Sequence, residues 1–257
     1  MPPIAVTKLH GTFNDFVLLD ARVEPVPDLP EFARRVCDRR GGVGADGLLI
    51  VHPSQIAHAR MQVINADGSE AEMCGNGMRC AIRYLSENGE GDNFRMETLG
   101  GIIGADVIEK GATYQIRLNV GTPVFGERAL PFRDADFVVM GNPHVAIFAR
   151  EADEIDVVQA GKRMPDVNVH VVVPRGAQRL DVRHYERGVG ETYACGTGAV
   201  SCAVAAIRRG IAKSPVEVHV PGGALRVEWD GSGDAYLTGP AVRVFDAQVE
   251  DARALPA

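Results

Sequence analysis

Two copies of a short motif, in which a cysteine is followed by glycine at the first and third positions after it, constrain the fold more than any other feature of this chain. The copies are CGNG at 74–77 and CGTG at 195–198, and each has a glutamate four residues before its cysteine. The cysteines lie 121 residues apart, close to half of the 257-residue chain. Self-similarity over such a distance indicates an internal duplication. The sequence therefore predicts an α+β protein of two similar domains, each carrying one motif.

A helix is expected after each motif. Between residues 76 and 87, apolar residues recur at the spacing of one helical face and charged residues lie elsewhere, which predicts an amphipathic helix. The apolar residues are Met78, Ala81, Ile82 and Leu85, and the charged residues are Arg79, Arg83 and Glu87. The segment 197–210 is instead apolar or small nearly all round until its two arginines. This pattern predicts a buried helix at the centre of a domain.

Short runs rich in β-branched residues make strands the majority element. The expected strands are 15–20, 47–51, 61–65, 114–120, 137–140, 167–173, 216–220 and 225–229, and weaker helical patterns cover 29–40 and 153–163. We place the domain junction near 120–123. Residues 1–120 then form one domain with Cys74, and residues 121–257 form the other with Cys195, with the last strand able to pack on the first domain. The duplication further predicts that the two motifs face each other across a cleft that closes about this junction.

The start of a helix suits an anion. Its first turn leaves backbone N–H groups without partners, and the helix dipole adds about half a positive charge there. Glycines at the first and third positions after the cysteine let a carboxylate approach the backbone closely. A thiol at the same place has its thiolate favoured, so its pKa is expected to fall below the free value of about 8.5. Each motif can therefore bind a carboxylate and act as an acid or a base.

The two thiols together indicate a specific reaction. If one is a thiolate and the other a thiol, the first removes a proton from one face of a carbon and the second returns a proton to the opposite face. The N–H groups at the helix starts would stabilise the charge that spreads onto the neighbouring carboxylate. The predicted reaction is inversion of an α-carbon without a cofactor.

Composition limits the partners. Charged residues make up 24% of the chain and hydrophobic residues 46%, as in ordinary globular proteins, and the net charge is -7. This charge argues against nucleic acid and favours a small-molecule substrate. No apolar run approaches membrane-spanning length and the first residues lack a signal-peptide pattern, so we expect a cytoplasmic protein with no membrane partner. The five cysteines are an odd number and do not make a disulfide framework, and Cys37, Cys80 and Cys202 are interpreted as packing residues.

Three other interpretations of these motifs fit less well. A zinc site needs ligands at short spacing, which Cys74 with Cys80 and Cys195 with Cys202 do not provide, so no metal is expected. The run GVGADG at 42–47 has dinucleotide-binding spacing, but it precedes an expected strand instead of following one, so it is interpreted as a glycine turn. A disulfide between Cys74 and Cys195 would represent oxidative inactivation.

Seven stretches resemble the diaminopimelate epimerase family in order and spacing, over nearly the whole chain. They are KLHGTFNDFVLLD (8–20), CDRRGGVGADGLLIV (37–51), NADGSEAEMCGNGMRC (65–80), MGNPHV (140–145), NVHVV (168–172), YERGVGETYACGTGA (185–199) and GGALRVEW (222–229). The resemblance implies an isomerase without a cofactor, built from two pseudo-symmetric domains that are each a mainly antiparallel sheet wrapped around a central helix. It also implies interconversion of LL- and meso-diaminopimelate, in lysine and cell-wall precursor biosynthesis.

The resemblance also implies a role for each matching residue. Cys74 and Cys195 would be the acid/base pair, and His144 and Glu186 would adjust their protonation. The positions that would contact the substrate are Asn14, Asn65, Gly75, Asn76, Asn142, Asn168, Glu186, Arg187, Gly196 and Thr197. This set suits a substrate with two amino acid ends, because amides donate and accept, a carboxylate pairs with an ammonium, and a guanidinium pairs with the far carboxylate.

Substrate identity is less constrained than reaction type. Some family members have glutamine where this chain has Gly47, Thr12-Phe13 replaces smaller residues before Asn14, and the segment 148–168 is short. The alternative enzyme is another cofactor-independent racemase of the same fold, acting on histidine or another single amino acid. Proline racemase-like enzymes usually show histidine where this chain has Asn76. The alternative from another class is a thiol switch or a binding protein without catalysis, and a homodimer also stays open.

Overall fold

The computed structural model describes residues 3–23 and 28–250; residues 1–2, 24–27 and 251–257, which the predicted domains include, lie outside that description. The chain forms two compact units, one made of Met1–Ile116 with Pro240–Ala257 and the other of Arg117–Gly239. Residues from Pro240 onward belong to the first unit because the last strand pairs there with the first strand. That the two units are separate domains of the predicted kind stays a proposal.

Strands dominate the described residues and four helices accompany them, which confirms the predicted α+β class. The helices are α1 (Leu29–Val36), α2 (Gly75–Glu87), α3 (Val157–Arg163) and α4 (Gly196–Arg208). The strands of the first unit are β1 (Ile4–Gly11), β2 (Asn14–Asp20), β3 (Gly47–His52), β4 (Ala59–Asn65), β5 (Glu70–Ala71), β6 (Asn93–Thr98) and β7 (Gly101–Glu109). Those of the second are β9 (Val124–Gly126), β10 (Ala135–Met140), β11 (Asn142–Phe148), β12 (Asn168–Pro174), β13 (Arg179–Glu186), β14 (Gly190–Thr192), β15 (Val216–Val220) and β16 (Gly223–Glu228). The strands β8 (Thr113–Gly121) and β17 (Ala235–Val249) contribute residues to both units.

The strand pairing of the two units repeats. In the first unit β1–β2 is antiparallel, β2–β3 parallel, β3–β4 antiparallel and β4–β6 parallel. In the second unit β10–β11, β11–β12, β12–β13 and β13–β15 follow with the same four orientations. A short antiparallel hairpin, β4–β5 or β13–β14, then precedes α2 or α4. This shared order confirms the internal duplication.

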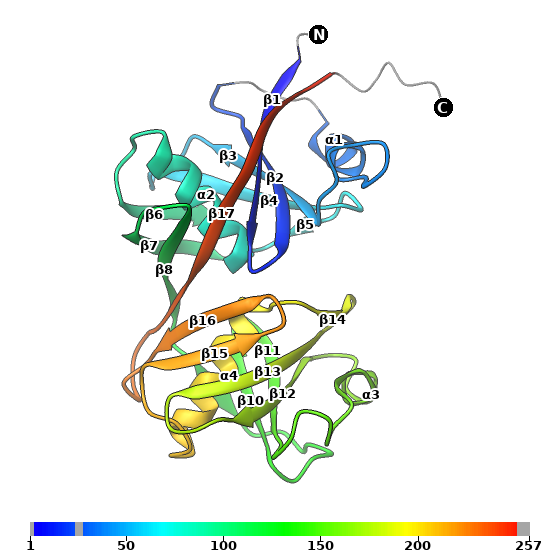
Figure 1. The fold of residues 1–257 in the computed structure, drawn as a ribbon, viewed down its shortest axis with the longest axis vertical. Coiled ribbons are helices and arrows are strands. Elements are labelled where there is room, and N and C mark those ends of the chain that lie inside the picture. The colour runs from blue at the N-terminus through cyan, green and yellow to red at the C-terminus, as the bar shows by residue number, and fades with distance from the viewer. Residues whose placement is uncertain (1–2, 24–27, 251–257) are drawn as a thin grey trace. The chain divides into compact units, whose positions relative to one another are not determined.

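One helix lies at the centre of each unit. The helix α2 contacts β1, β2, β3, β4 and β7, and α4 contacts β10 to β13 as well as β15 and β16 (Figure 1). The helix α4 can be surrounded because its residues are small or apolar, with Ala199, Val200, Ala203 and Val204 fully buried. The prediction of a sheet wrapped around a central helix is confirmed for both units.

The predicted amphipathic helix α2 is present, but its charged face is buried as well as its apolar face. Arg79 has no solvent exposure and Arg83 only 6%, although the sequence pattern placed both on a polar face. Strands also cover this face of the helix. The guanidinium of Arg83 donates to the carbonyl oxygen of Ala241 on β17 and forms an ion pair with Glu87. These contacts satisfy the N–H groups of the buried guanidinium. The sequence periodicity therefore located the charged residues but did not show whether they are exposed.

The glycine turn after α1 has the predicted form. The helix predicted over 29–40 ends at Val36, and the backbone N–H groups of Val43 and Gly44 both donate to the Val36 carbonyl oxygen. A Cβ atom at Gly42 would lie 2.2 Å from the carbonyl oxygen of Arg35, so only glycine allows this close approach. The run 42–47 therefore joins a helix to β3, in the reverse order to a dinucleotide-binding turn.

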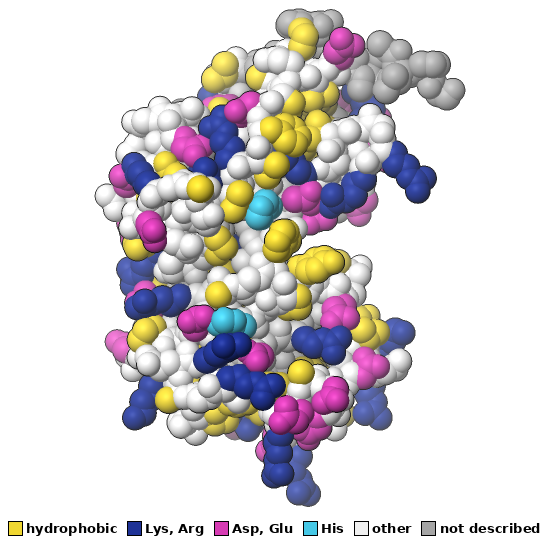
Figure 2. Space-filling model, viewed as in Figure 1, with side chains coloured by type: hydrophobic (Ala, Val, Ile, Leu, Met, Phe, Trp, Pro, Cys, Tyr) yellow, Lys and Arg dark blue, Asp and Glu magenta, His cyan; other side chains and the backbone are white. Residues whose placement is uncertain are grey.

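The surface has mixed charge. Figure 2 shows acidic and basic side chains interspersed over the visible face of each unit, with no extended area of one sign. Among the helices in the described ranges, none is both long and apolar enough to cross a membrane.

Candidate active site

The first motif places Cys74 directly before α2. Cys74 is the N-cap residue in an extended conformation, and its Sγ accepts from the backbone N–H of Gly77 at 3.5 Å. The thiol donates to the Oδ1 of Asn14 at 3.6 Å, and this oxygen also accepts from the Nδ2 of Asn76 at 3.2 Å. The structure therefore brings Asn14, Cys74 and Asn76 together, with the partly buried thiol at the positive end of the helix.

A buried arginine supports this group, and the sequence analysis missed its part in the site. Arg79 donates from Nη2 to the Oδ1 of Asn76 at 2.8 Å and from Nε to the carbonyl oxygen of Pro240 at 2.9 Å. Burial lowers the pKa of Arg79 to about 10, while Cys80 and Cys74 act to raise it, so the guanidinium is charged at neutral pH. The signal was the arginine inside CGNGMRC, which the helical pattern placed away from the apolar face.

Asn14 is in turn held from the glycine turn. Its Nδ2 donates to the Oδ2 of Asp46 at 2.8 Å, and Asp46 forms an ion pair with Arg39 at 2.9 Å. Because Asp46 takes the N–H₂ group of Asn14, the Oδ1 of Asn14 is turned toward Cys74 and Asn76. Asp46 belongs to GVGADG, which the sequence analysis interpreted only as a glycine turn, without a role for the carboxylate.

Two other predicted residues of this unit lie at the end of β4 and at the start of α2. Asn65 ends β4 opposite Gly47 on β3, and its Nδ2 donates to the Oγ of Ser69 at 2.9 Å. Gly75 is the first residue of α2 and leaves open space where a Cβ atom would stand. A ligand atom could therefore approach the helix start at Gly75 without meeting a side chain.

The second motif places Cys195 in the equivalent position before α4. Cys195 is the extended N-cap residue, is only 5% exposed, and lies 3.7 Å from the Oγ1 of Thr197. The first helical residue, Gly196, is buried, and Thr197 is partly buried. The two motifs thus share their backbone form.

The expected fall in thiol pKa is wrong for Cys195. Burial raises the pKa of Cys195 well above 9.0, and the carboxylate of Glu186, which is hydrogen-bonded to the thiol, adds to that effect. The N–H of Gly198 and the hydroxyl of Thr197 lower it by less. The helix start therefore does not outweigh desolvation here, and Cys195 carries its proton at neutral pH.

Glu186 ends β13 beside this thiol. Its carboxylate accepts from the Oγ1 of Thr192 at 2.6 Å, and burial raises its pKa. A carboxylate that contacts a thiol can hold or accept the thiol proton. Glu186 therefore contacts the Cys195 thiol, and its influence on the protonation of the thiol stays a prediction.

Asn168 and Arg187 are linked through the backbone. The Oδ1 of Asn168 accepts from the backbone N–H of Arg187 at 2.9 Å, and its Nδ2 donates to the carbonyl oxygen of Pro143 at 3.3 Å. The guanidinium of Arg187 is exposed and lies 3.4 Å from the carbonyl oxygen of Asp166. The nearby carboxylate of Asp166 forms its ion pair with Arg128 and interacts with Arg187 only through charge.

His144 belongs to a buried set of three histidines. Its Nε2 lies 2.6 Å from the Oδ1 of Asn142, and its Nδ1 lies 2.9 Å from the Nε2 of His170. The Nδ1 of His170 lies 2.8 Å from the Nδ1 of His184. The sequence analysis missed His170 and His184, because both occupy inward-facing positions of strands that otherwise carry valine or leucine.

The site residues occupy equivalent strand ends in the two units. Asn14 begins β2 and Asn142 begins β11, while Gly47 begins β3 and Asn168 begins β12. Likewise, Asn65 ends β4, Glu186 ends β13, and each cysteine precedes a central helix. The duplication therefore explains why polar residues far apart in sequence recur at one end of each sheet.

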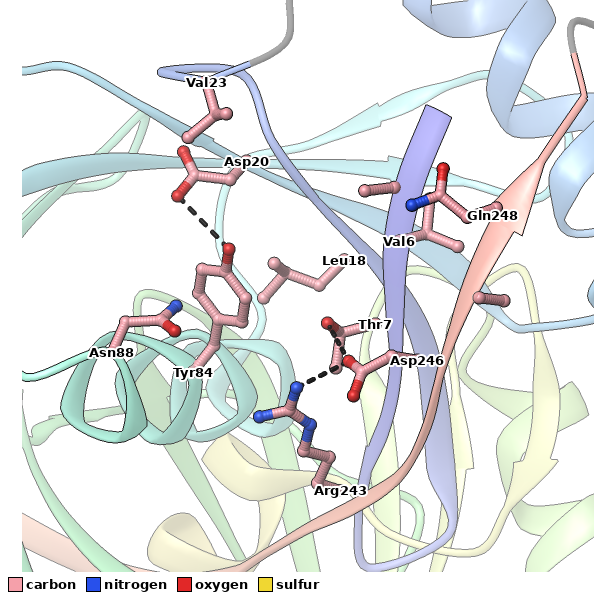
Figure 3. Close-up of a pocket in the computed structure, with 12 residues that line it drawn as sticks. Val6, Thr7, Leu18, Asp20, Val23, Tyr84, Asn88, Arg243, Asp246 and Gln248 are labelled. Carbon is pink, nitrogen blue, oxygen red and sulfur yellow. Dashed lines mark hydrogen bonds and ion pairs between the residues drawn. The ribbon is translucent and has the colours of Figure 1, made fainter. Parts of the chain in front are cut away.

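The chain also has a pocket away from these residues. It encloses about 430 Å³ and is lined by side chains of β1, β2, α2 and β17. Figure 3 shows that its polar groups face one another: the hydroxyl of Tyr84 points to Asp20, and both Thr7 and Arg243 point to Asp246. None of the predicted site residues lines it.

Within residues 3–23 and 28–250, no group of three or more histidine, cysteine or acidic side chains could hold a metal ion.

Arg79 is expected to control the reactivity of Cys74. Replacing Arg79 with methionine removes a positive charge that favours the thiolate, so alkylation of Cys74 by iodoacetamide at pH 7 should slow about tenfold, the effect of one pKa unit. Arg79→Lys keeps a cationic side chain whose pKa burial lowers and which lacks the planar guanidinium, so its rate should lie between those of the wild type and the methionine variant. Mass spectrometry of the labelled peptide measures the rate, with circular dichroism as the check on folding. Equal rates for all three proteins would contradict the role assigned to this charge.

The buried histidines predict a loss of stability in mild acid. Burial lowers the pKa of His144 and of His184 to about 3, whereas unfolded imidazoles have values near 6.5. Between pH 3 and pH 6.5 the unfolded state therefore binds more protons than the folded state. The contribution of these neutral histidines to the free energy of unfolding is fully present above pH 6.5 and is lost as pH falls below it. The free energy of unfolding in urea should fall between pH 7 and pH 5.5 in both proteins, and the fall should be smaller for His184→Asn than for the wild type by about 1.2 kcal/mol, the contribution of one imidazole with an unfolded pKa near 6.5. Identical pH dependence in both proteins would refute this assignment.

Comparisons with known proteins agree with this geometry. The family model described as diaminopimelate epimerase matches residues 6–126 and 137–244. Diaminopimelate epimerase of Moorella thermoacetica is 42% identical over 271 residues, covering 93% of this chain and 96% of that protein. Diaminopimelate epimerase of Sphingopyxis alaskensis is 40% identical over 267 residues, covering 95% and 96%. The structure of a predicted epimerase from Pseudomonas aeruginosa superposes with a TM-score of 0.76 at 14% identity, covering 96% of this chain and 99% of that one. The chain belongs to the diaminopimelate epimerase family.

Proposed function

We propose that this protein interconverts LL- and meso-diaminopimelate by a two-cysteine acid/base mechanism, as a step in the biosynthesis of lysine and cell-wall precursors. Membership of the family supports the reaction. The observation that carries the mechanism is the pair of cysteines at equivalent helix starts in two copies of one fold. Each copy also places polar residues at the strand ends beside its cysteine.

The reacting carboxylate binds at the helix starts in this proposal. The backbone N–H groups of Gly75 and Asn76, and those of Gly196 and Thr197, belong to the first turns of α2 and α4. N–H groups there lack intrahelical acceptors and carry the positive end of the helix dipole. They stabilise the negative charge that develops on the carboxylate when the α-carbon loses its proton.

In this proposal the two cysteines begin the reaction in different roles. Cys195 is held as a thiol by burial and by Glu186, whereas Cys74 has the charged Arg79 nearby and accepts from the Gly77 N–H. In one direction the Cys74 thiolate takes the α-proton and leaves a carbanion stabilised by the carboxylate. The Cys195 thiol then gives its proton to the opposite face, so the α-carbon is inverted and the two sulfurs have exchanged states. Glu186 can receive or return the Cys195 proton between turnovers.

The far end of the substrate is recognised by the remaining polar residues. The exposed guanidinium of Arg187 suits the far carboxylate, and the carboxylate of Glu186 suits an ammonium. Amide groups of Asn14, Asn65, Asn142 and Asn168 complete the set in this proposal. A single-headed amino acid would use only the part of the site at the helix starts, which separates the proposed reaction from the alternative racemases.

The mechanism is also compatible with a cytoplasmic homodimer, which we include in the proposal. A reducing compartment keeps catalytic thiols reduced. Val244 and Phe245 on β17 are 53% and 44% exposed, and a second copy of the chain could cover them. Light scattering at micromolar concentration measures the mass, and a monomer mass would remove this part of the proposal.

Replacing either Cys74 or Cys195 with serine should abolish inversion, because the weak acidity of a hydroxyl prevents it from acting as either base or acid here. We expect a loss of at least about a hundredfold, the usual contribution of one acid/base group. The measurement is deuterium incorporation into LL-diaminopimelate in heavy water, together with formation of the meso isomer. Cys202→Ala alters only a buried packing residue and should keep activity. Full inversion by either serine variant would contradict the mechanism, and absence of exchange in the wild type would favour a binder or thiol switch.

Arg187 should distinguish the substrates. Arg187→Ala removes a charge-assisted hydrogen bond to the far carboxylate, so kcat/KM for diaminopimelate should fall about tenfold to a hundredfold. Arg183→Ala removes a partly exposed arginine of β13, which pairs with Glu191, and serves as the control. Racemisation of histidine or another single amino acid by the wild type at a comparable rate would support the alternative enzyme instead.

A further inference from the structure

Three buried histidines form a row across β11, β12 and β13. His144, His170 and His184 have no solvent exposure, and each lies two residues along its strand from a polar residue of the proposed site. Those polar residues are Asn142, Asn168 and Glu186. On the other side of the row, the same strand faces continue with Ala146, Val172 and Val182 of the apolar core around α4. The histidine row therefore separates that core from the polar strand ends.

Hydrogen bonds connect the row in one direction. Burial lowers the pKa of all three imidazoles, so each ring is neutral at pH 7 and has one donor nitrogen and one acceptor nitrogen. The Oδ1 of Asn142 can only accept, so His144 donates from Nε2 and accepts at Nδ1. His170 then donates to His144 from Nε2 and accepts at Nδ1. His184 must donate to His170 from Nδ1.

The end of the row fits this direction. Within the described residues, the Nε2 of His184 is buried without a hydrogen-bond partner. In the direction given above, this nitrogen is a bare acceptor. In the reverse direction it would be a buried N–H without an acceptor, which proteins avoid more strictly than an unused acceptor. The row therefore runs from His184 through His170 and His144 to Asn142.

We propose that His170 and His184 are positioning residues that hold His144 with its proton on Nε2, and thereby fix the amide of Asn142 with its carbonyl oxygen inward and its N–H₂ group available to a ligand. This inference rests on the proposed function, because it concerns a residue of that site. It explains why two further imidazoles lie in a layer that apolar residues could fill. A ligand atom that meets Asn142 is then an acceptor, such as a carboxylate oxygen.

The first turn of α4 packs closely against the middle of the row. A Cβ atom at Gly198 would lie 2.5 Å from the Cε1 and 2.8 Å from the Nε2 of His170, and 3.1 Å from the Sγ of Cys195. Glycine at this position leaves His170 the space in which it bonds to both neighbouring histidines. The glycine at the third position after the cysteine thus serves the histidine row in addition to the helix start.

Nitrogen NMR of the free protein tests the tautomers directly. Two-bond ¹H–¹⁵N correlation spectra at pH 7 distinguish Nδ1–H, Nε2–H and imidazolium forms, and His184→Asn and His170→Gln assign the signals. We expect Nε2–H for His144 and His170 and Nδ1–H for His184. An Nδ1–H form of His144, or an imidazolium at any of the three positions, would overturn the proposal whether or not the protein is an epimerase.

Kinetics of two His184 variants test the consequence. Phenylalanine fills the ring space but cannot donate, whereas the amide nitrogen of asparagine can take the place of Nδ1 and donate to His170. His184→Phe should raise KM for diaminopimelate about fivefold with less than a twofold change in kcat, and His184→Asn should stay within twofold for both. Equal KM increases in the two variants would show a merely structural role and overturn the proposal. If the wild type lacks epimerase activity, the proposed function fails while the NMR result still decides the tautomers.

Discussion

The structure depends on a helix start that is enclosed by its own sheet. An isolated helix exposes its first N–H groups to solvent. Water accepts their hydrogen bonds, and solvent and salt weaken their electrostatic field. In each unit of this chain the central helix is surrounded by strands, so the groups at its start act in partly buried surroundings where charge interactions are stronger. The extended N-cap cysteines direct their sulfur atoms to that place. Catalysis by thiols without a cofactor needs such a concentration of positive potential.

Duplication supplies the same backbone twice, and individual side chains then give the two copies different electrostatics. Near Cys74 the charged residue is Arg79 of α2, whose buried guanidinium donates a hydrogen bond to Asn76. Near Cys195 the charged residue is Glu186, at the end of β13 in the hairpin that precedes α4. A cation beside one thiol and a carboxylate beside the other favour opposite protonation states. A symmetric backbone can therefore serve an acid and a base at the same time.

Much of this arrangement could be predicted from sequence because it follows from local patterns. Each of the eight expected strands has a counterpart, and β15 has the predicted bounds, since runs of β-branched residues mark buried strands well. Other strands were missed, including β1, β6, β7, β11, β13 and β17. In β13 the inward positions include a histidine, and in β17 the alternation is interrupted by glycine and proline. The roles of Arg79 and Asp46 were missed for another reason. Their significance lies in contacts with residues of other strands, such as Pro240 and Asn14, which no local pattern contains.

The route of β17 has a consequence for how the protein is made. Its residues from Pro240 onward complete the first unit, and the carbonyl oxygen of Pro240 accepts a hydrogen bond from Arg79 beneath the first thiol. The middle of the chain, residues 117–239, leaves the ribosome before this strand does. The later-encoded unit can therefore finish folding first, although domains usually fold in the order of synthesis. A nascent chain acquires the surroundings of Cys74 only when its final strand has emerged, so truncated products would contain the thiol without the contacts that activate it.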